Sequence, residues 1–323
     1  MTNEKSRGFV TIATGHERYY TIALNLLKSY RLNSKNPLPF AIIADRENEI
    51  TNQFDKVVIT PNPHNSYMDK LLIGDYLPFD ETIFIDADCL AYSDLNVLFD
   101  IFKDSDDFCC LGMTQPLAEQ TDGWFSLASF PLSKGDNSDV LDREAAQNTL
   151  PYAVGMHGGM YYARKTERAQ SVFRDALKTA SNYNSYKFCM FEKPADEPVL
   201  ALAMALNNCK PIPYDSFALT CFWVHPDVKL NMYKGQAHRK DGTPIPLMHW
   251  GNFNTKAPVY KKQVDQMNMR IGGIKGAKVF FTNLGNSFRM AGYSLKQVYY
   301  SFKTVVFRAM SKLPVIGKKL KSE

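Results

Sequence analysis

Short apolar segments alternate with helical segments over the first 115 residues, and this alternation restricts the fold more than any other feature of the sequence. The expected strands are rich in Val, Ile and Phe and cover Gly8–Thr14, Pro39–Asp45, Lys56–Thr60, Thr82–Asp86 and Asp107–Met113. The helical patterns between them cover Glu17–Arg31, Ser66–Leu77 and Leu95–Lys103. Apolar strands joined by helices are typical of a doubly wound α/β fold with a mainly parallel sheet. Ligands of such folds bind beyond the carboxyl ends of the strands.

The alternation becomes less regular after residue 115. Gln115–Thr149 is polar and is expected to form loops over the sheet. Gly155–Ala163 predicts a strand in which Gly158 and Gly159 allow a close backbone approach. The remaining chain predicts helices and then a turn-rich region of short strands, over Thr166–Asn182, Pro198–Asn207 and Ile212–His249.

The composition is that of a globular protein, with 45% hydrophobic and 22% charged residues among 323, which excludes disordered and fibrous classes. No apolar run approaches the roughly 18 residues of a membrane span, and the N-terminus has no apolar signal region. Six cysteines are scattered without a Cys-x-x-Cys pair, so we expect reduced, buried thiols rather than a zinc module. These features favour a cytoplasmic protein.

Basic residues are concentrated at the C-terminal end. Residues 261–323 hold thirteen Lys or Arg and two acidic residues, whereas residues 1–260 hold twenty-five basic and thirty-one acidic residues. Tyr293–Leu313 has apolar residues at helical spacing with basic residues towards the other side, which is typical of an amphipathic helix that lies in a membrane interface. We therefore expect a main domain over 1–265 and a tail over 266–323 that binds an anionic membrane surface. The alternative is a helix that packs its apolar face on the main domain; the acidic main domain argues against a nucleic-acid partner.

The clearest chemical signal is the motif Asp86–Ala87–Asp88, which follows the apolar strand Thr82–Asp86. Alternate residues at a strand end point the same way, so both carboxylates are expected to face one site. Paired carboxylate oxygens are ligands that Mg²⁺ and Mn²⁺ prefer, with phosphate oxygens filling other positions.

Several motifs together resemble the glycogenin-like glycosyltransferases (family eight), which include bacterial lipopolysaccharide galactosyl- and glucosyltransferases. Lys70 precedes the Asp-x-Asp motif and Leu98–Phe99 follow it at the family's spacing. The opening segment Val10–Leu24 is similar to the family's first strand and nucleotide loop, with Thr14 and Tyr19 in place. Weaker similarity covers the glycine pair of Met156–Lys165, the acid pair of Ala195–Ala205 and the His–Gly–Lys signature of Pro246–Tyr260.

This resemblance implies a Rossmann-like nucleotide-sugar transferase fold of the GT-A type and a hexosyltransferase activity. The donor would be a UDP-sugar, with galactose or glucose favoured, and the acceptor a saccharide or a lipid-linked saccharide at the inner face of a membrane. The implied cofactor is Mn²⁺, with Mg²⁺ also compatible, held by Asp86, Asp88 and His249. The implied donor contacts are Thr14, Tyr19, Lys70, Asp86, Ala87, Asp88, Gly251 and Lys256, and the implied acceptor side is His157, Gly158 and Gly159.

The same resemblance implies retention of anomeric configuration and places Asp196 and Glu197 at the catalytic centre. Glu197 replaces the family's glutamine, so a covalent route through its carboxylate and a front-face route both remain open; the two acids would also suit a helix start before Pro198. Two other functions remain open. One is a catalytically inactive carbohydrate-binding or membrane-scaffold relative. The other is a phosphatase of the haloacid-dehalogenase type, in which Asp86 would be the nucleophile and Asp88 the acid–base group.

Overall fold

The computed structural model describes residues 5–115, 150, 152–183, 195–213 and 219–310, with side chains described up to residue 294. The chain divides into two compact units. The first unit consists of Met1–Leu230 and Lys234–Asn252, and the second of Asn231–Tyr233 and Phe253–Glu323. A division at residues 265 and 266 stays a prediction, as does the loop prediction for Gln115–Thr149, which lies almost entirely outside the described residues.

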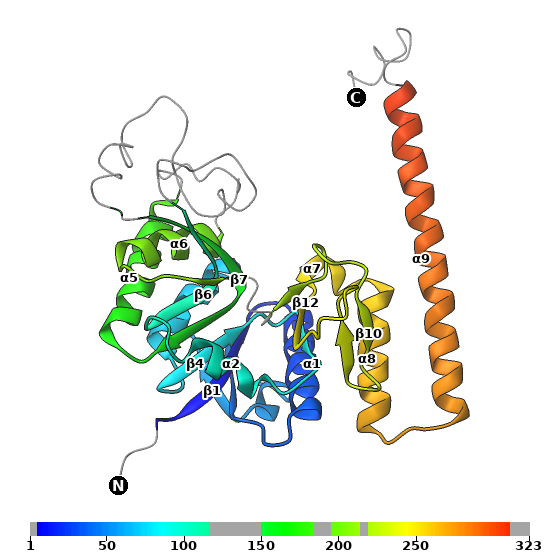
Figure 1. The fold of residues 1–323 in the computed structure, drawn as a ribbon, viewed down its shortest axis with the longest axis horizontal. Helices are drawn as coiled ribbons and strands as arrows, with labels where there is room; N and C mark the ends of the chain where they lie inside the picture. Colours follow the sequence, from blue (N-terminus) through cyan, green and yellow to red (C-terminus); the bar gives the residue numbers. More distant parts are fainter. Residues whose placement is uncertain (1–4, 116–149, 151, 184–194, 214–218, 311–323) are drawn as a thin grey trace. The chain divides into compact units, whose positions relative to one another are not determined.

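A seven-stranded sheet forms the centre of the first unit, in the order β3-β2-β1-β4-β7-β6-β8 (Figure 1). Its strands are β1 (Arg7–Ala13), β2 (Phe40–Ala44), β3 (Lys56–Ile59), β4 (Glu81–Ile85), β6 (Phe108–Gln115), β7 (Ala153–Arg164) and β8 (Ile212–Pro213). Neighbouring strands are parallel except β7, which is antiparallel to both β4 and β6. The expected mainly parallel α/β sheet flanked by helices is therefore confirmed, with one central antiparallel strand that the apolar pattern did not indicate.

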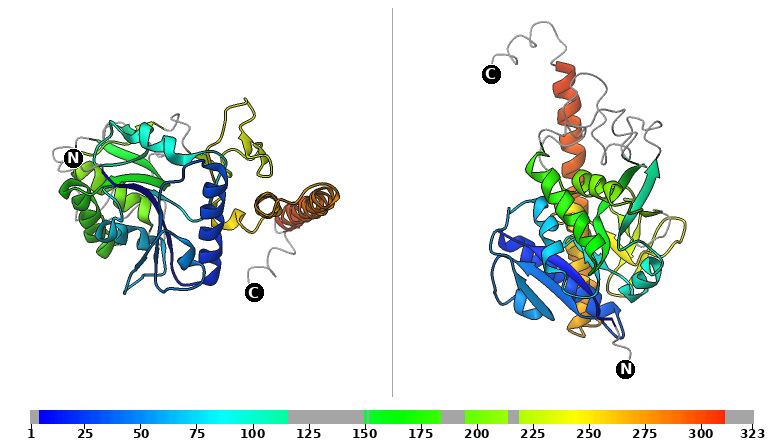
Figure 2. Two further views of the ribbon diagram at one scale, coloured as in Figure 1. Left: turned by 90° about the horizontal axis from the view of Figure 1, so that it is seen from below. Right: turned by 90° about the vertical axis from the view of Figure 1, so that its left-hand side faces the viewer.

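Helices cover both faces of this sheet, because the strands carry apolar side chains on both faces. One face packs α1 (Glu17–Asn33) and α2 (Leu98–Phe102) against residues such as Phe9 and Ile83. The other packs α5 (Glu167–Ser181), α6 (Asp196–Leu206) and the segment η2 (Tyr67–Tyr76) against residues such as Val10 and Phe84. Figure 2 shows α1 and the α5–α6 pair on opposite sides of the sheet.

The segment η2 differs from its sequence-based prediction. The pattern predicts an α-helix over Ser66–Leu77, whereas Tyr67–Tyr76 winds as a 3-10 helix. A Cβ on Gly74 would lie 2.4 Å from Phe173 of α5, so the segment packs closely against that helix. The Asp69 carboxylate also accepts hydrogen bonds from the Thr14 hydroxyl and the His64 amide, both at 2.5 Å. Long 3-10 runs are uncommon and often occur at functional sites.

A second, three-stranded sheet lies beyond the end of β4. It consists of β5 (Cys89–Ala91), β12 (Leu247–His249) and β9 (Thr220–Cys221), in the order β5-β12-β9. His249 is in register with Cys89 on one side and with Cys221 on the other. The first unit also contains most of the hairpin β10 (Lys229–Asn231) and β11 (Gln236–His238), and the 3-10 segments η1 (Thr51–Gln53) and η3 (Leu95–Val97).

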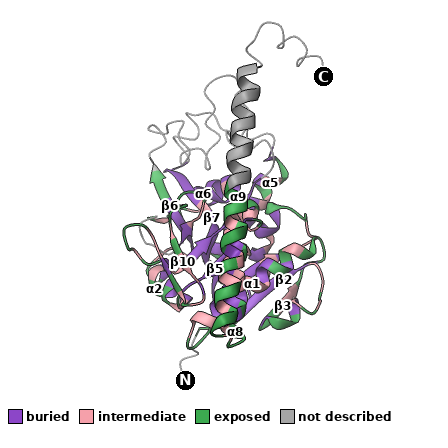
Figure 3. Cartoon of the chain, turned by 90° about the vertical axis from the view of Figure 1, so that its right-hand side faces the viewer, coloured by how far each residue is buried: buried purple, intermediate pink, exposed green. Residues whose placement is uncertain are grey.

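The second unit is helical. It contains α8 (Pro258–Ile271) and α9 (Ala277–Met310), and the short helix α7 (Gly251–Asn254) spans the boundary between the units. Polar contacts join α8 to α9: the Gln266 amide donates to Asn283 at 3.1 Å, and Arg289 lies 3.2 Å from Asp265. The described part of α9 is mostly exposed or half-buried (Figure 3). Among the described helices, none combines the length and the apolarity that a membrane crossing requires.

Candidate active site

The Asp-x-Asp motif lies in the turn that links the two sheets. All five residues of β4 are buried, and the chain leaves this strand at Asp86. The Asp86 amide donates to the Gly159 carbonyl of β7 at 2.9 Å, and the Asp88 carbonyl accepts from the Trp250 amide at 3.1 Å. These main-chain bonds fix the turn between the end of the main sheet and the start of β5.

Lys70 is buried among the carboxylates of this turn. Its Nζ lies 2.9 Å from Asp86, 3.0 Å from Asp196 and 3.2 Å from the Gly158 carbonyl oxygen. Burial alone would lower the lysine pKa, but the two carboxylates outweigh it and hold the pKa well above its ordinary value. Burial raises the pKa of Asp86 to about 6 despite the lysine. Lys70, which was expected to contact the donor, is therefore paired with two acids in this structure.

His249 lies on the other side of the same aspartates. Its Nε2 is 3.0 Å from Asp88 and 3.6 Å from Asp86. Burial would lower the pKa of His249, but Asp88 and Asp86 hold it well above its ordinary value. Burial alone would raise the pKa of Asp88, but the adjacent imidazole of His249 outweighs burial and lowers this pKa overall.

These three side chains fit a divalent cation. Two donors in adjacent positions around an octahedral Mg²⁺ or Mn²⁺ lie about 3 Å apart, close to the distances between His249 and the two carboxylates. Four carboxylic groups (Asp86, Asp88, Asp196 and Glu197) also outnumber the lysine and the histidine, which leaves negative charge for a cation to balance.

The N-terminus of α6 packs against the glycine pair of β7. The Glu197 carboxylate accepts a 2.8 Å hydrogen bond from the Gly158 amide. A Cβ on Gly158 would lie 2.7 Å from Glu197 and 2.8 Å from Asp196, so only glycine leaves room for both acids. Burial, with the neighbouring Asp196, raises the pKa of Glu197 to about 7. The two acids do start a helix, and Asp196 is also linked to Asp86 of the Asp-x-Asp turn by Lys70, which contacts both.

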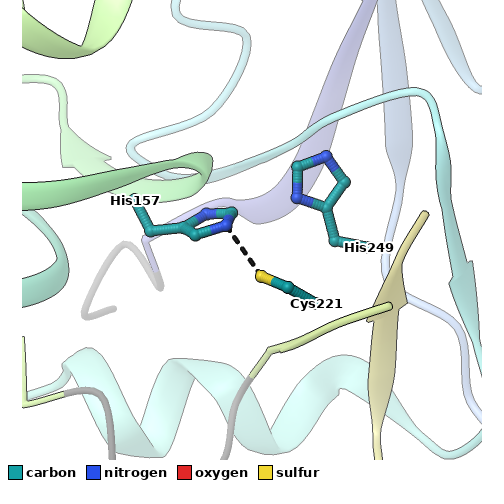
Figure 4. Close-up of side chains that lie close together, drawn as sticks. All are labelled: His157, Cys221 and His249. Atoms are coloured by element: carbon teal, nitrogen blue, oxygen red, sulfur yellow. Dashed lines mark hydrogen bonds between the residues drawn. The ribbon is translucent and has the colours of Figure 1, made fainter. Parts of the chain in front are cut away.

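The expected acceptor-side residue His157 contacts two residues that the sequence patterns did not single out. Its Nε2 lies 2.8 Å from Cys221 Sγ (Figure 4). Its ring also stacks on Trp223, with centroids 5.9 Å apart. Burial lowers the pKa of His157 to about 3, so its ring is neutral at physiological pH. Four of the five described cysteines are buried, as expected, but Cys221 is partly exposed beside this ring. No motif spacing links residues 157 and 221, so only the tertiary structure, which brings β7 next to β9, reveals the pair.

A cavity of ≈ 850 Å³ opens beside the Asp-x-Asp turn. Several predicted donor-site residues line it, namely Thr14, Tyr19, Lys70, Asp86, Ala87 and Asp88. Tyr67 and Asp69 of η2 also line it and were not predicted. Tyr67 is more than half exposed, so its ring presents a face to the cavity opening that stacking on a planar group could use.

Two predicted donor contacts are not among the lining residues. Gly251 starts α7 with a left-handed backbone (φ +68°), a conformation that favours glycine. Lys256 belongs to the second unit. Their roles stay predictions.

No protein-family model matches this chain, and no curated protein matches it. Similar solved structures include the crystal structure of the galactosyltransferase LgtC in complex with donor and acceptor sugar analogues. Its sequence is 12% identical to this chain, and the TM-score is 0.47. The match covers 84% of this chain and 97% of that chain. Another is an active-site mutant of LgtC in which glutamate replaces a glutamine, which is 11% identical, with the same TM-score and coverage. A likeness at this level carries no conclusion about activity, so the function has to be argued from this chain's own site.

Proposed function

We propose that this protein is a metal-dependent glycosyltransferase that moves a hexose, galactose or glucose, from a UDP-sugar to a saccharide or glycolipid acceptor. The observation that carries the proposal is the convergence of Asp86, Asp88 and His249, with both aspartates lining a cavity large enough for a nucleotide. Carboxylate and imidazole donors suit Mn²⁺, and Mg²⁺ is the other candidate. When bound, the ion would supply positive charge that offsets the diphosphate of the leaving group.

The other residues of the site have roles that follow from their positions. Tyr19 and Tyr67, both at least one-third exposed at the cavity, offer aromatic faces to a uracil base. Lys70 is already charge-paired, so it would turn from Asp86 towards an arriving phosphate or stay to orient the aspartate. If it stays, the buried ammonium holds both Asp86 and Asp196; if it turns, it keeps its contact with Asp196.

We propose that the reaction retains anomeric configuration, as the resemblance to glycogenin-like enzymes implies. Glu197 accepts a hydrogen bond from the Gly158 amide, and burial raises its pKa to about 7, so much of it is the neutral acid near pH 7. A neutral, hydrogen-bonded carboxylic acid resembles an amide more than a carboxylate nucleophile. This supports the front-face route over a covalent glycosyl–enzyme.

One assay separates this function from its two alternatives. The purified protein is incubated with UDP-galactose or UDP-glucose, with Mn²⁺ or with a chelator, and released UDP is measured. The proposed enzyme releases UDP only with the metal. An inactive relative releases none under either condition, and a phosphatase of the haloacid-dehalogenase type instead hydrolyses a phosphomonoester such as p-nitrophenyl phosphate.

We further propose that α9 attaches the protein to an anionic membrane surface on the cytoplasmic side. The face of α9 that contacts α8 is polar, with Asn283 and Arg289. Large apolar side chains instead stay exposed along the helix, namely Phe280, Phe281, Leu284, Phe288 and Tyr293. Exposed aromatics on a basic helix are typical of interfacial membrane binding, and each basic residue near an anionic leaflet adds about 1 kcal/mol.

A further inference from the structure

Three side chains from distant parts of the sequence place nitrogen and sulfur atoms together next to the Asp-x-Asp turn. The Sγ of Cys221 and ring nitrogens of His157 and His249 all lie within 4.8 Å of one another. The side chains converge from β7, β9 and β12, and Figure 4 shows both rings near the thiol. The rings of His157 and His249 meet nearly at right angles, with centroids 5.1 Å apart.

The backbone leaves space for the side chains of His157, Cys221 and His249. Cys221 and His249 are register partners on adjacent parallel strands, so their side chains share one face of the small sheet. Gly159 lies between the two histidines, and a Cβ there would lie 2.6 Å from His249 and 2.8 Å from His157. Trp223 covers the two rings from one side, with centroids 5.9 Å from His157 and 4.8 Å from His249.

We propose that His157, Cys221 and His249 form a zinc site, separate in its chemistry from the carboxylate site of Asp86 and Asp88. A thiolate with two imidazoles is a donor set that selects Zn²⁺ over Mn²⁺ and Mg²⁺. Tetrahedral Zn²⁺, with bonds of about 2.0–2.3 Å, places its donors roughly 3.3–3.6 Å apart, so small side-chain shifts complete the site. Three protein ligands leave a fourth position for water or another ligand.

A competing set shares His249. Asp88, Cys89 and His249 also place one donor atom each within 4.8 Å of one another. Cys89 is completely buried in the apolar cluster between the sheet and α1, whereas Cys221 and His157 are both partly exposed. An ion can therefore reach Cys221 from solvent and keep a water ligand there, which favours the His157–Cys221–His249 set.

The shared histidine gives the zinc site a consequence for the carboxylate site. The Nε2 of His249 lies 3.0 Å from Asp88, whereas its Nδ1 lies next to Gly159 on the side of His157. A neutral imidazole has only one nitrogen free to bind a metal, so one ring cannot hold both ions unless it loses its remaining proton. Zn²⁺ bound by the three residues therefore weakens Mn²⁺ binding at Asp86 and Asp88. This consequence rests on the proposed function, whereas zinc binding itself does not.

Cobalt binding to the reduced full-length protein tests the site without any assay of activity. Co²⁺ replaces Zn²⁺, and a Co²⁺–thiolate bond gives a charge-transfer absorption in the near ultraviolet. We expect this absorption in the wild type, its displacement by one equivalent of Zn²⁺, and its loss in Cys221→Ser. Cys209→Ser removes a buried thiol elsewhere in the first unit and is expected to keep the absorption.

Further variants identify the residues that bind the metal ion. His157→Asn is expected to weaken Zn²⁺ binding at least ~10-fold, and circular dichroism checks that each variant is folded. Absence of the thiolate absorption in the folded wild type would overturn the proposal. So would its loss in Cys89→Ser with retention in Cys221→Ser, because the ligand set would then be the competing one. A wild type that binds Co²⁺ through Cys221 but releases no UDP supports the zinc site and contradicts only the proposed function.

Discussion

At the scale of single residues, the positive and negative side chains that neighbour one another determine the chemistry of the site. Lys70 lies between Asp86 and Asp196, and His249 lies against Asp86 and Asp88 on the other side. Burial raises the pKa of Asp86 and of Glu197, whereas the adjacent imidazole of His249 lowers the pKa of Asp88. Single substitutions that change this balance should alter binding more than they alter folding.

Asp88→Asn is the most direct test of the metal ligands. The amide keeps the side-chain volume but removes the charge that holds His249, so Mn²⁺ affinity should fall at least ~10–100-fold. Isothermal titration with Mn²⁺ and UDP measures the loss. Asp104→Asn, at an exposed position of the same unit, serves as the matched control and should bind like the wild type. Wild-type Mn²⁺ affinity in Asp88→Asn would exclude this carboxylate as a ligand.

Glu197→Gln separates the two routes of sugar transfer. If transfer follows the front-face route, the amide replaces a neutral acid and UDP release should stay within a few-fold of the wild type. A covalent route needs the carboxylate, and turnover would then fall by several orders of magnitude. Steady-state kinetics distinguishes these outcomes, and a glycosyl adduct on Glu197 in the mass spectrum of the wild type would contradict the expected route.

The same residue predicts a pH dependence of stability. The pKa of Glu197 rises from 4.5 to about 7 in the folded protein, so the unfolded chain releases this proton first. Stability should therefore fall as the pH rises from 4.5 to 7, and the loss should persist above pH 7. Glu197→Gln removes this contribution, so its melting temperature should exceed that of the wild type by a few degrees at pH 8 and match it at pH 4.5. Thermal unfolding without metal, at both pH values, measures the difference; equal gaps at both would contradict the raised pKa.

At the scale of elements, the close approach of β7 to its neighbours decides the geometry of the site. Gly159→Ala places a methyl group against both imidazoles, which must move by several tenths of an ångström or more. We expect Mn²⁺ affinity to fall at least ~10-fold, with about 1–3 kcal/mol lost from the free energy of unfolding through overpacking. Gly285→Ala in α9, where a Cβ meets nothing within 4 Å, is the control. Unchanged metal binding in Gly159→Ala would show that the position of His249 is not critical.

At the scale of the whole molecule, the exposed aromatics of α9 predict where the protein resides. The full-length double variant Phe281→Asp/Phe288→Asp places charge on an apolar face without touching the polar face that contacts α8. We expect it to lose co-sedimentation with anionic liposomes and to keep UDP release. Phe253→Asp, which changes an exposed aromatic outside α9, should sediment like the wild type. Binding of the wild type that is equal on neutral and anionic liposomes, or insensitive to salt, would contradict the electrostatic part of the proposal.

The sequence by itself determined the strands of the main sheet and the position of the Asp-x-Asp motif at the end of one of them. The inner strands β2 and β4 are buried on both faces, so their apolar runs are visible without knowledge of their neighbours. The resemblance of the Lys70–Phe99 stretch to a known family also placed Lys70, Asp86 and Asp88 in one site, and the structure does bring them together.

Only the tertiary structure decided the contacts between residues far apart in the chain. The insertion of β7 as an antiparallel strand, the pairing of Lys70 with Asp196 and the meeting of His157 with Cys221 depend on strand order and register. Local periodicity reports whether a side chain is buried, not which distant side chain it meets. The exposure of the apolar face of α9 also depends on tertiary contacts. Asn283 and Arg289 contact α8, and these contacts determine which side of α9 remains exposed.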